Sequence, residues 1–230
     1  MIDRRELLKL GISAFAFGCA TSEDPSRIRA RPGQPAGPLK PPAILYVPPK
    51  PTGAFALILH GATGEPDRII NRLRPDADEF GITLLAPKSQ DITWDAIRGN
   101  FGPDVAAIDD ALRAAFATCQ VDRKHVGVAG FSDGATYALA LGRANGDLFT
   151  HVMAFSPGFL IPVETVGHAK FFLSHGTRDE ILPIDEASRH IARELRRENL
   201  SVKLREFDGP HTLPPEIARE AFAWFVGSGL

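Results

Sequence analysis

Two glycines flank one serine in the stretch GFSDG at residues 130–134, and this spacing constrains the fold more than any other feature of the chain. Residues 126–129 form a short apolar run typical of a buried strand, and residues 135–141 are apolar and favour a helix. The pattern predicts a strand that turns sharply into a helix, with Ser132 at the turn. Glycine on either side lets the strand and the helix approach without a clash of side chains. Such a turn leaves the Ser132 hydroxyl exposed.

Short apolar runs alternate with helical stretches along most of the chain, which predicts an α/β fold with a mostly parallel sheet and helices on both faces. We expect strands at 43–47, 55–60, 83–86, 125–130, 151–155, 170–174 and 202–207, and helices at 66–79, 103–118, 134–144, 184–198 and 214–227. The first of these strands can also pair antiparallel at the edge of the sheet. Residues 156–169 are too few and too rich in proline and glycine to form a helical cap domain.

A serine hydroxyl is a weak nucleophile until a base accepts its proton, and the base works best when a third group orients it. His211 lies in a Gly-Pro turn after the predicted strand 202–207, and Asp179 is the first carboxylate after the predicted strand 170–174. The order serine, acid, histidine is the order in one known class of serine hydrolases. We therefore expect Ser132, Asp179 and His211 to act together.

Other residues compete for the two supporting roles. His175 lies closer to Asp179 in the sequence but precedes it, against the expected order, so its loss is expected to spare much of the activity. The alternatives for the acid are Glu180, Asp185 and Asp208. The remaining histidines adjoin apolar strands or lie on a predicted helix, where structural or solvated roles are expected: His60, His125, His151, His168 and His190.

Acyl transfer to a serine also needs backbone N–H groups that bind the negative oxygen of the intermediate. We expect one from Asp133, directly after Ser132, and one from Ala62 in the small-residue loop 60–64. Trp94 follows a predicted strand on the side where these loops gather. It is expected to line the substrate pocket, although tryptophan is also a common packing residue.

Four segments together resemble the α/β-hydrolase superfamily, closest to its small esterase branch of phospholipase/carboxylesterase-like and polyhydroxybutyrate-depolymerase-like enzymes. They are LILHGATG, VGVAGFSDG, SHGTRDEILP and GPH, and the resemblance covers residues 43–227. It implies an α/β-hydrolase fold without a cap domain and a carboxylic-ester hydrolase that forms an acyl-enzyme, with no metal and no cofactor. By the same resemblance, Ser132, Asp179 and His211 match the catalytic triad, and Ala62 and Asp133 match the oxyanion positions.

The chain departs from this branch in two places. Ala135 stands where the branch often has a second glycine after the elbow, and the loop after His60 reads Ala62-Thr63-Gly64 where two glycines are common. The acyl pocket is therefore not specified by the resemblance. Two other functions stay open, a serine peptidase of the same fold and a non-catalytic binding protein built on it.

The first 42 residues differ from the remainder, 43–230, which we interpret as the catalytic domain. Residues 1–19 have Arg4-Arg5 before a short apolar run, which is typical of a twin-arginine export signal. Cys19 resembles the lipidated cysteine of bacterial lipoproteins, and cleavage after Ala16 or Ala20 would instead release a soluble protein. Residues 20–42 hold six prolines and are predicted to be a linker. The chain is thus expected to be periplasmic or anchored to a membrane.

The composition narrows the range of partners. A formal charge of −2, with 44% hydrophobic and 23% charged residues, is typical of a soluble globular protein and does not suggest nucleic-acid binding. The sequence contains no H-E-x-x-H, C-x-x-C, G-x-G-x-x-G or P-loop motif. The expected partner is a small-molecule or polymer ester. The sequence does not specify an oligomeric state.

Overall fold

A computed structural model describes residues 24–40 and 42–228, and the described residues contain a seven-stranded sheet. The strands are β1 (Ile44–Tyr46), β2 (Phe55–Leu59), β3 (Thr83–Ala86), β4 (Val126–Phe131), β5 (His151–Phe155), β6 (Lys170–Gly176) and β7 (Ser201–Phe207). Their order is β1-β3-β2-β4-β5-β6-β7. Only β1 pairs antiparallel, with β3 at the edge. The predicted mostly parallel sheet is therefore confirmed, including the antiparallel alternative for its first strand.

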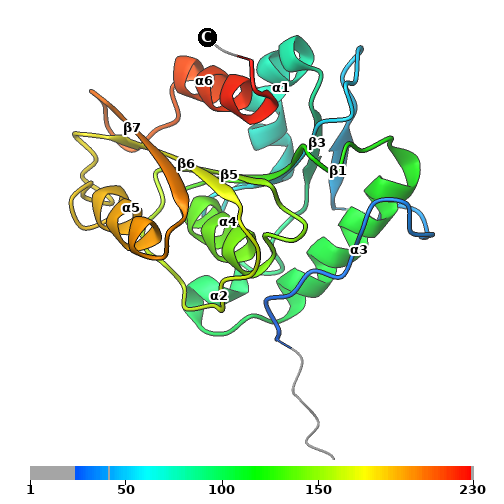
Figure 1. The fold of residues 1–230 in the computed structure, drawn as a ribbon, viewed down its shortest axis with the longest axis horizontal. Coiled ribbons are helices and arrows are strands. Elements are labelled where there is room, and N and C mark those ends of the chain that lie inside the picture. Colours follow the sequence, from blue (N-terminus) through cyan, green and yellow to red (C-terminus); the bar gives the residue numbers. More distant parts are fainter. Residues whose placement is uncertain (1–23, 41, 229–230) are drawn as a thin grey trace, which may run out of the picture.

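Helices cover both faces of this sheet, as Figure 1 shows. On one face lie α1 (Pro66–Phe80) and α6 (Pro215–Val226), and on the other lie α3 (Pro103–Thr118), α4 (Asp133–Ala144) and α5 (Ser188–Arg197). Each face has its own hydrophobic core. The inner strands are buried on both sides, which explains why they are mostly apolar and do not alternate between apolar and polar residues.

One short helix was not predicted, and one predicted helix begins later than expected. The four-residue helix α2 (Asp95–Arg98) was not predicted, because one turn is too short to show a hydrophobic period. Residues 184–187 form turns, so α5 begins four residues later than expected. The connection 156–169 between β5 and β6 contains no helix, in agreement with the expected lack of a cap.

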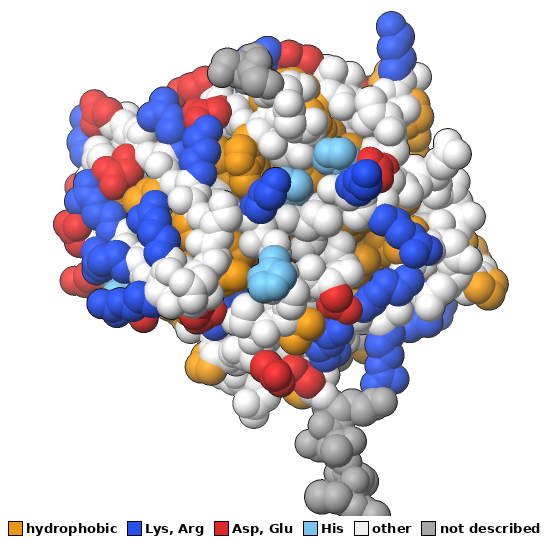
Figure 2. All heavy atoms as spheres, viewed as in Figure 1, with side chains coloured by type: hydrophobic (Ala, Val, Ile, Leu, Met, Phe, Trp, Pro, Cys, Tyr) orange, Lys and Arg blue, Asp and Glu red, His pale blue; other side chains and the backbone are white. Residues whose placement is uncertain are grey.

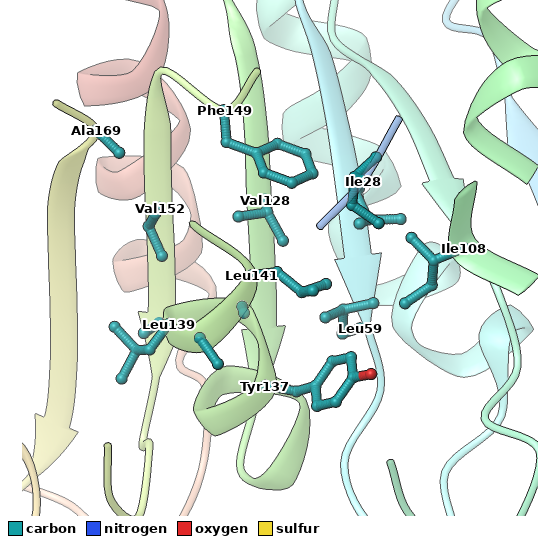
Figure 3. Packing of buried hydrophobic residues seen from close by; sticks show 14 of the residues in the cluster. Ile28, Leu59, Ile108, Val128, Tyr137, Leu139, Leu141, Phe149, Val152 and Ala169 are labelled. Atoms are coloured by element: carbon teal, nitrogen blue, oxygen red, sulfur yellow. The ribbon is translucent and has the colours of Figure 1, made fainter. Parts of the chain in front are cut away.

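The prediction of a linker over residues 20–42 is wrong for the part that packs against the domain. Ile28 and Ala30 are buried, and Figure 3 shows Ile28 pointing into the core cluster beside Ile108. The Ile28 amide donates to Asn145 Oδ1 at 2.7 Å, and the Ala30 amide donates to Asp109 Oδ1 at 2.6 Å. Along 27–31, buried apolar residues alternate with arginines that are exposed or half-buried. This segment is therefore part of the folded domain.

The predicted export signal 1–19 and Cys19 lie outside the described residues. Within residues 24–40 and 42–228, no helix combines the length and the apolar character needed to cross a membrane. Figure 2 shows cationic and anionic side chains interspersed over α5 and β7, where Arg189 pairs with Glu206 at 2.6 Å. Neither sign of charge dominates this part of the surface.

Candidate active site

The turn between β4 and α4 holds Ser132 in a conformation that L-residues rarely adopt, with φ 57° and ψ −122°. Such a backbone costs on the order of 1–3 kcal/mol and persists only where the surroundings enforce it. A Cβ on Gly130 would lie 2.2 Å from the Gly134 carbonyl oxygen, and a Cβ on Gly134 would lie 2.2 Å from the Leu59 carbonyl oxygen. Glycine is therefore required at both positions, and the predicted strand–turn–helix is confirmed.

The structure brings together the three residues that the sequence predicted. The Ser132 hydroxyl lies 2.9 Å from His211 Nε2, and His211 Nδ1 lies 2.6 Å from Asp179 Oδ2. In the tautomer that satisfies both contacts, Nδ1–H donates to the carboxylate and Nε2 accepts from the serine. The His211 ring packs against Phe131, with 4.9 Å between ring centroids. The three side chains thus form one continuous hydrogen-bonded chain.

Two loops that follow adjacent parallel strands carry the acid and the histidine. The Thr177 amide donates to the Phe207 carbonyl at 2.8 Å, and the Arg178 amide donates to the Gly209 carbonyl at 2.9 Å. A Cβ on Gly176 would lie 2.3 Å from the Gly209 carbonyl oxygen, so the loops touch at a glycine. These backbone contacts fix the position of the acid relative to the histidine.

The Asp179 carboxylate is buried but has several donors. Its Oδ1 accepts from the amides of Ile181 at 3.0 Å and Leu182 at 2.8 Å. Burial alone would raise the pKa of Asp179, but the hydrogen bonds from Leu182 and His211 outweigh it and hold the pKa below its ordinary value. Asp179 is therefore ionised at neutral pH, next to the ring of His211.

The three alternative acids face solvent instead. Asp185 pairs with Arg189 at 2.9 Å, Asp208 pairs with Arg178 at 2.9 Å, and Glu180 is exposed. Among the described residues, His211 has its only carboxylate contact with Asp179.

The two predicted oxyanion donors lie on segments next to Ser132. Asp133 is the first residue of α4, so its N–H has no partner within the helix. A Cβ on Gly61 would lie 3.3 Å from Ser132 Cβ, which places the loop 60–64 against the serine. No hydrogen bond within residues 24–40 and 42–228 uses the amide of Ala62 or of Asp133. Both N–H groups are thus available to an oxygen atom of a bound molecule.

The prediction that Trp94 lines the substrate pocket is wrong for this structure, because its side chain is fully buried. Its ring stacks on Tyr137, with 5.3 Å between centroids, and its Nε1–H donates to the His60 carbonyl at 2.8 Å. Trp94 therefore supports the loop that carries Ala62.

Sequence reasoning missed two contacts of the site. Thr93 Oγ1 donates to the Asp133 carboxylate at 2.6 Å, and His175 Nε2 lies 3.0 Å from Asp179 Oδ2. The i,i+4 spacing of His175 and Asp179 was visible in the sequence, but chain order was used only to reject His175 as the base. Within residues 24–40 and 42–228, no group of three or more histidine, cysteine or acidic side chains is arranged to hold a metal ion.

Comparison with known proteins yields structural similarity only. No protein-family model matches the chain, and neither does any curated protein sequence. Esterase PE8 has a similar structure, with a TM-score of 0.66 and 18% identity over 82% of this chain and 98% of its own. The Bacillus cereus carboxylesterase has a TM-score of 0.65 and 17% identity over 81% of this chain and 94% of its own. The fluorophosphonate-binding serine hydrolase F of Staphylococcus aureus has a TM-score of 0.63 and 15% identity over 80% of this chain and 91% of its own. At these identities the similarity establishes the fold, which is the α/β-hydrolase fold.

Proposed function

We propose that this α/β-hydrolase-fold chain is a serine hydrolase that cleaves carboxylic esters through an acyl-enzyme on Ser132. The observation that carries the proposal is the hydrogen-bonded chain from Ser132 through His211 to Asp179, next to two unused backbone amides. The structures with similar folds include proteins titled esterase, carboxylesterase and serine hydrolase, which supports the same class of reaction.

The proposed reaction has two halves. Ser132 Oγ attacks the acyl carbon while its proton moves to His211 Nε2, and the amides of Ala62 and Asp133 bind the oxyanion. The intermediate collapses, the acyl–oxygen bond breaks, and His211 gives the proton to the departing alcohol. A water molecule then loses a proton to His211 and attacks the acyl-enzyme, which releases the acid and restores the serine hydroxyl. Throughout, Asp179 holds the His211 tautomer and stabilises the imidazolium.

The test is ester hydrolysis by the purified protein and by Ser132→Ala. We expect p-nitrophenyl acetate to be hydrolysed by the wild type, and the alanine variant to lose turnover while it keeps its fold. Full activity in Ser132→Ala would contradict the proposal. A peptide p-nitroanilide serves as the amide comparison, and faster turnover of the amide than of the ester would favour a peptidase.

We propose short acyl esters as the preferred substrates, because the segment 156–169 has no helix to cover a long chain. Each CH₂ group that is buried is worth about 0.8 kcal/mol, but only where a wall receives it. Catalytic efficiency, kcat/KM, is expected to fall from acetyl to palmitoyl esters, without a rate increase when the ester forms an emulsion. A steady rise to palmitoyl would contradict this substrate class.

We also propose that the chain is exported, on the strength of Arg4-Arg5 and the apolar run that follows. Replacing both arginines with lysine is expected to leave the precursor in the cytoplasm if the twin-arginine route is used. The mass of the mature N-terminus decides the fate of Cys19. A diacylglyceryl-cysteine means an anchored enzyme, whereas a free N-terminus at Phe17 or Thr21 means a soluble one.

A further inference from the structure

A second histidine contacts the acid of the proposed triad. His175, in β6, is completely buried, and its Nε2 lies 3.0 Å from Asp179 Oδ2. The same carboxylate oxygen lies 2.6 Å from His211 Nδ1. Asp179 therefore stands between two imidazole rings, and only one of them reaches Ser132.

The neighbours of His175 fix where its proton lies. Nε2 is 2.7 Å from the Leu182 carbonyl oxygen, which can only accept, so Nε2 carries the hydrogen. Nδ1 is 2.7 Å from Ser188 Oγ and accepts the proton of that hydroxyl. Burial lowers the pKa of His175, and the Leu182 carbonyl and the Asp179 carboxylate only partly oppose this effect. The ring is therefore neutral, and both of its nitrogens have partners.

Hydrogen bonds and one close contact connect His175, Leu182 and the acid. His175 Nε2–H donates to the Leu182 carbonyl at 2.7 Å and lies 3.0 Å from Asp179 Oδ2, while the Leu182 amide donates back to Asp179 Oδ1 at 2.8 Å. Ser188 ties the far side of the imidazole to the first turn of α5. The carboxylate thus cannot rotate without breaking a contact to a buried group. A buried polar group that loses its partner costs about 1–3 kcal/mol, which makes this arrangement stiff.

We propose that His175 is a positioning residue, which holds the Asp179 carboxylate in place toward His211 and withdraws part of its negative charge. The inference rests on the proposed function, since it concerns the efficiency of the same site. It also explains why a buried histidine adjoins the acid without reaching the serine. Carboxylate oxygens that accept fewer hydrogen bonds attract a neighbouring proton more strongly.

The other charged groups near His175 do not replace this contact. Its partner in the β6–β7 register is Glu206, whose carboxylate is bound by Arg189 from α5 at 2.6 and 2.8 Å. Arg189 also pairs with Asp185 at 2.9 Å. The charge of Glu206 is thus compensated, and Asp179 and His211 are the remaining titratable neighbours of His175.

Two substitutions at His175 test whether a donor to Asp179 is needed or whether any polar side chain is sufficient. The amide nitrogen of glutamine reaches the position of Nε2, so His175→Gln keeps a donor to Asp179. Asparagine reaches only the position of Nδ1, so His175→Asn loses it. We expect His175→Asn to lower kcat about tenfold or more with little change in KM, because the acid no longer holds the base in place. This loss is larger than the sequence alone suggested, because the contact of His175 with Asp179 was not predicted. His175→Gln is expected to stay within about threefold of the wild type.

The pH dependence of kcat/KM gives a second measurement. It would not change if His175 only stabilised the fold. Without the His175 donor, Asp179 stabilises protonated His211 more strongly, so the acid limb of kcat/KM is expected to move up by about half a pH unit in His175→Asn. His151→Asn is the matched control, because His151 is also buried but lies at the start of β5. It is expected to keep the kcat and the pH profile of the wild type.

The experiment measures kcat, KM and the pH profile of ester hydrolysis for the full chain and these variants, with circular dichroism as the check of folding. If His175→Asn does not fold, Ser188→Ala takes its place, because it removes the hydroxyl that fixes the His175 tautomer while leaving the ring. A smaller shift in the same direction is then expected. An unchanged kcat and acid limb in the folded variant would overturn the inference. Failure of the proposed function is seen separately, as an inactive wild type or an active Ser132→Ala.

Discussion

The two ends of the parallel sheet are built by different rules. At the carboxyl ends of the strands the backbone is strained, because Thr63, Ser132 and Ser156 all have positive φ without being glycine. The fourth such residue among the described ones, Asn199, lies just after helix α5. At the amino ends, two histidine rings pack with aromatic side chains of the last helix. His151 stacks with His125 at 6.4 Å between centroids and meets the edge of Trp224 at 5.0 Å.

The histidines at the two ends have different partners. At the carboxyl end, His211 bonds to Ser132 and Asp179, and its ring nitrogens are fully used by the proposed chemistry. At the amino end, His151 is a packing residue, and its burial lowers its pKa to about 4. Ligands of open α/β sheets bind outside the carboxyl ends of the strands, where loops leave the sheet and side chains need not fill a core. At the carboxyl end a histidine can reach Ser132, as His211 does, whereas His151 at the amino end only packs.

Substitution of one histidine at each end of the sheet is expected to change catalytic activity very differently. His211→Ala is expected to lower kcat by about 10³-fold or more at every pH while the free energy of unfolding changes little, because the site loses its base. His151→Ala is expected to do the reverse, with near-normal kcat and a loss of about 2–4 kcal/mol in stability from the lost ring contacts. Ester turnover and urea unfolding of both variants check this. Equal losses of activity would remove the contrast between the ends.

A substitution at Gly134 tests whether α4 must lie close to β2 next to Ser132. Gly134→Ala is expected to cost about 3 kcal/mol of stability, since its Cβ would meet the Leu59 carbonyl. Gly37→Ala is the control, because a Cβ there has no neighbour within 4 Å. Thermal melts of the two variants give the comparison. A melt of Gly134→Ala that coincides with the control would show that the strand and the helix are free to separate.

His151, at the amino end of the sheet, is expected to account for part of the loss of folding stability at acid pH. The folded pKa of His151, about 4, lies below the ordinary value of about 6.5, so the unfolded chain binds more protons between these values. The stability that neutral His151 provides is therefore complete above pH 6.5 and is lost as the pH falls toward 4, by up to about 3 kcal/mol.

His151→Phe keeps a ring and removes the titration, so the fall in stability between pH 7 and 4.5 is expected to be smaller in this variant than in the wild type. Urea midpoints at the two pH values measure it. His175 contributes in the same direction in both proteins and cancels from the difference. Parallel slopes for the two proteins would contradict the assignment.

The smallest effect concerns strain at the carboxyl end. Ser132→Gly is expected to be about 1 kcal/mol more stable than Ser132→Ala, because glycine adopts the observed φ of 57° without steric cost. Both variants lack the hydroxyl, so the comparison isolates the backbone. Chemical denaturation measures it, and a more stable alanine variant would mean that the turn is not strained.

Much of the site at the carboxyl ends of the strands could be predicted, because it depends on short sequence patterns. Glycines around Ser132, a carboxylate after one strand and a histidine after the next are all visible in sequence, and parallel strands carry them to one edge of the sheet. The burial of individual side chains could not be predicted from such local patterns. Trp94 is covered by Tyr137 from a helix far along the chain, which no local pattern indicates.

The segment before β1 was also predicted incorrectly because its contacts are with residues far along the chain. Its prolines suggested a linker, yet Ile28 and Ala30 enter a core formed by distant residues. The alternation of apolar residues with arginines over 27–31 was the available signal, but it is too short to outweigh the composition. The contact of His175 with Asp179 likewise depends on how the loop after β6 folds back, which spacing alone did not decide.

Covalent labelling tests directly whether Ser132 is the nucleophile. A fluorophosphonate reacts with a serine only where a base and an oxyanion site activate it, so the intact mass is expected to rise by one adduct. Peptide mapping is expected to place the adduct on Ser132, and Ser132→Ala is expected to stay unlabelled. A stoichiometric adduct on any other residue, or none on a folded wild type, would contradict the claim that the strained carboxyl end of β4 carries the nucleophile.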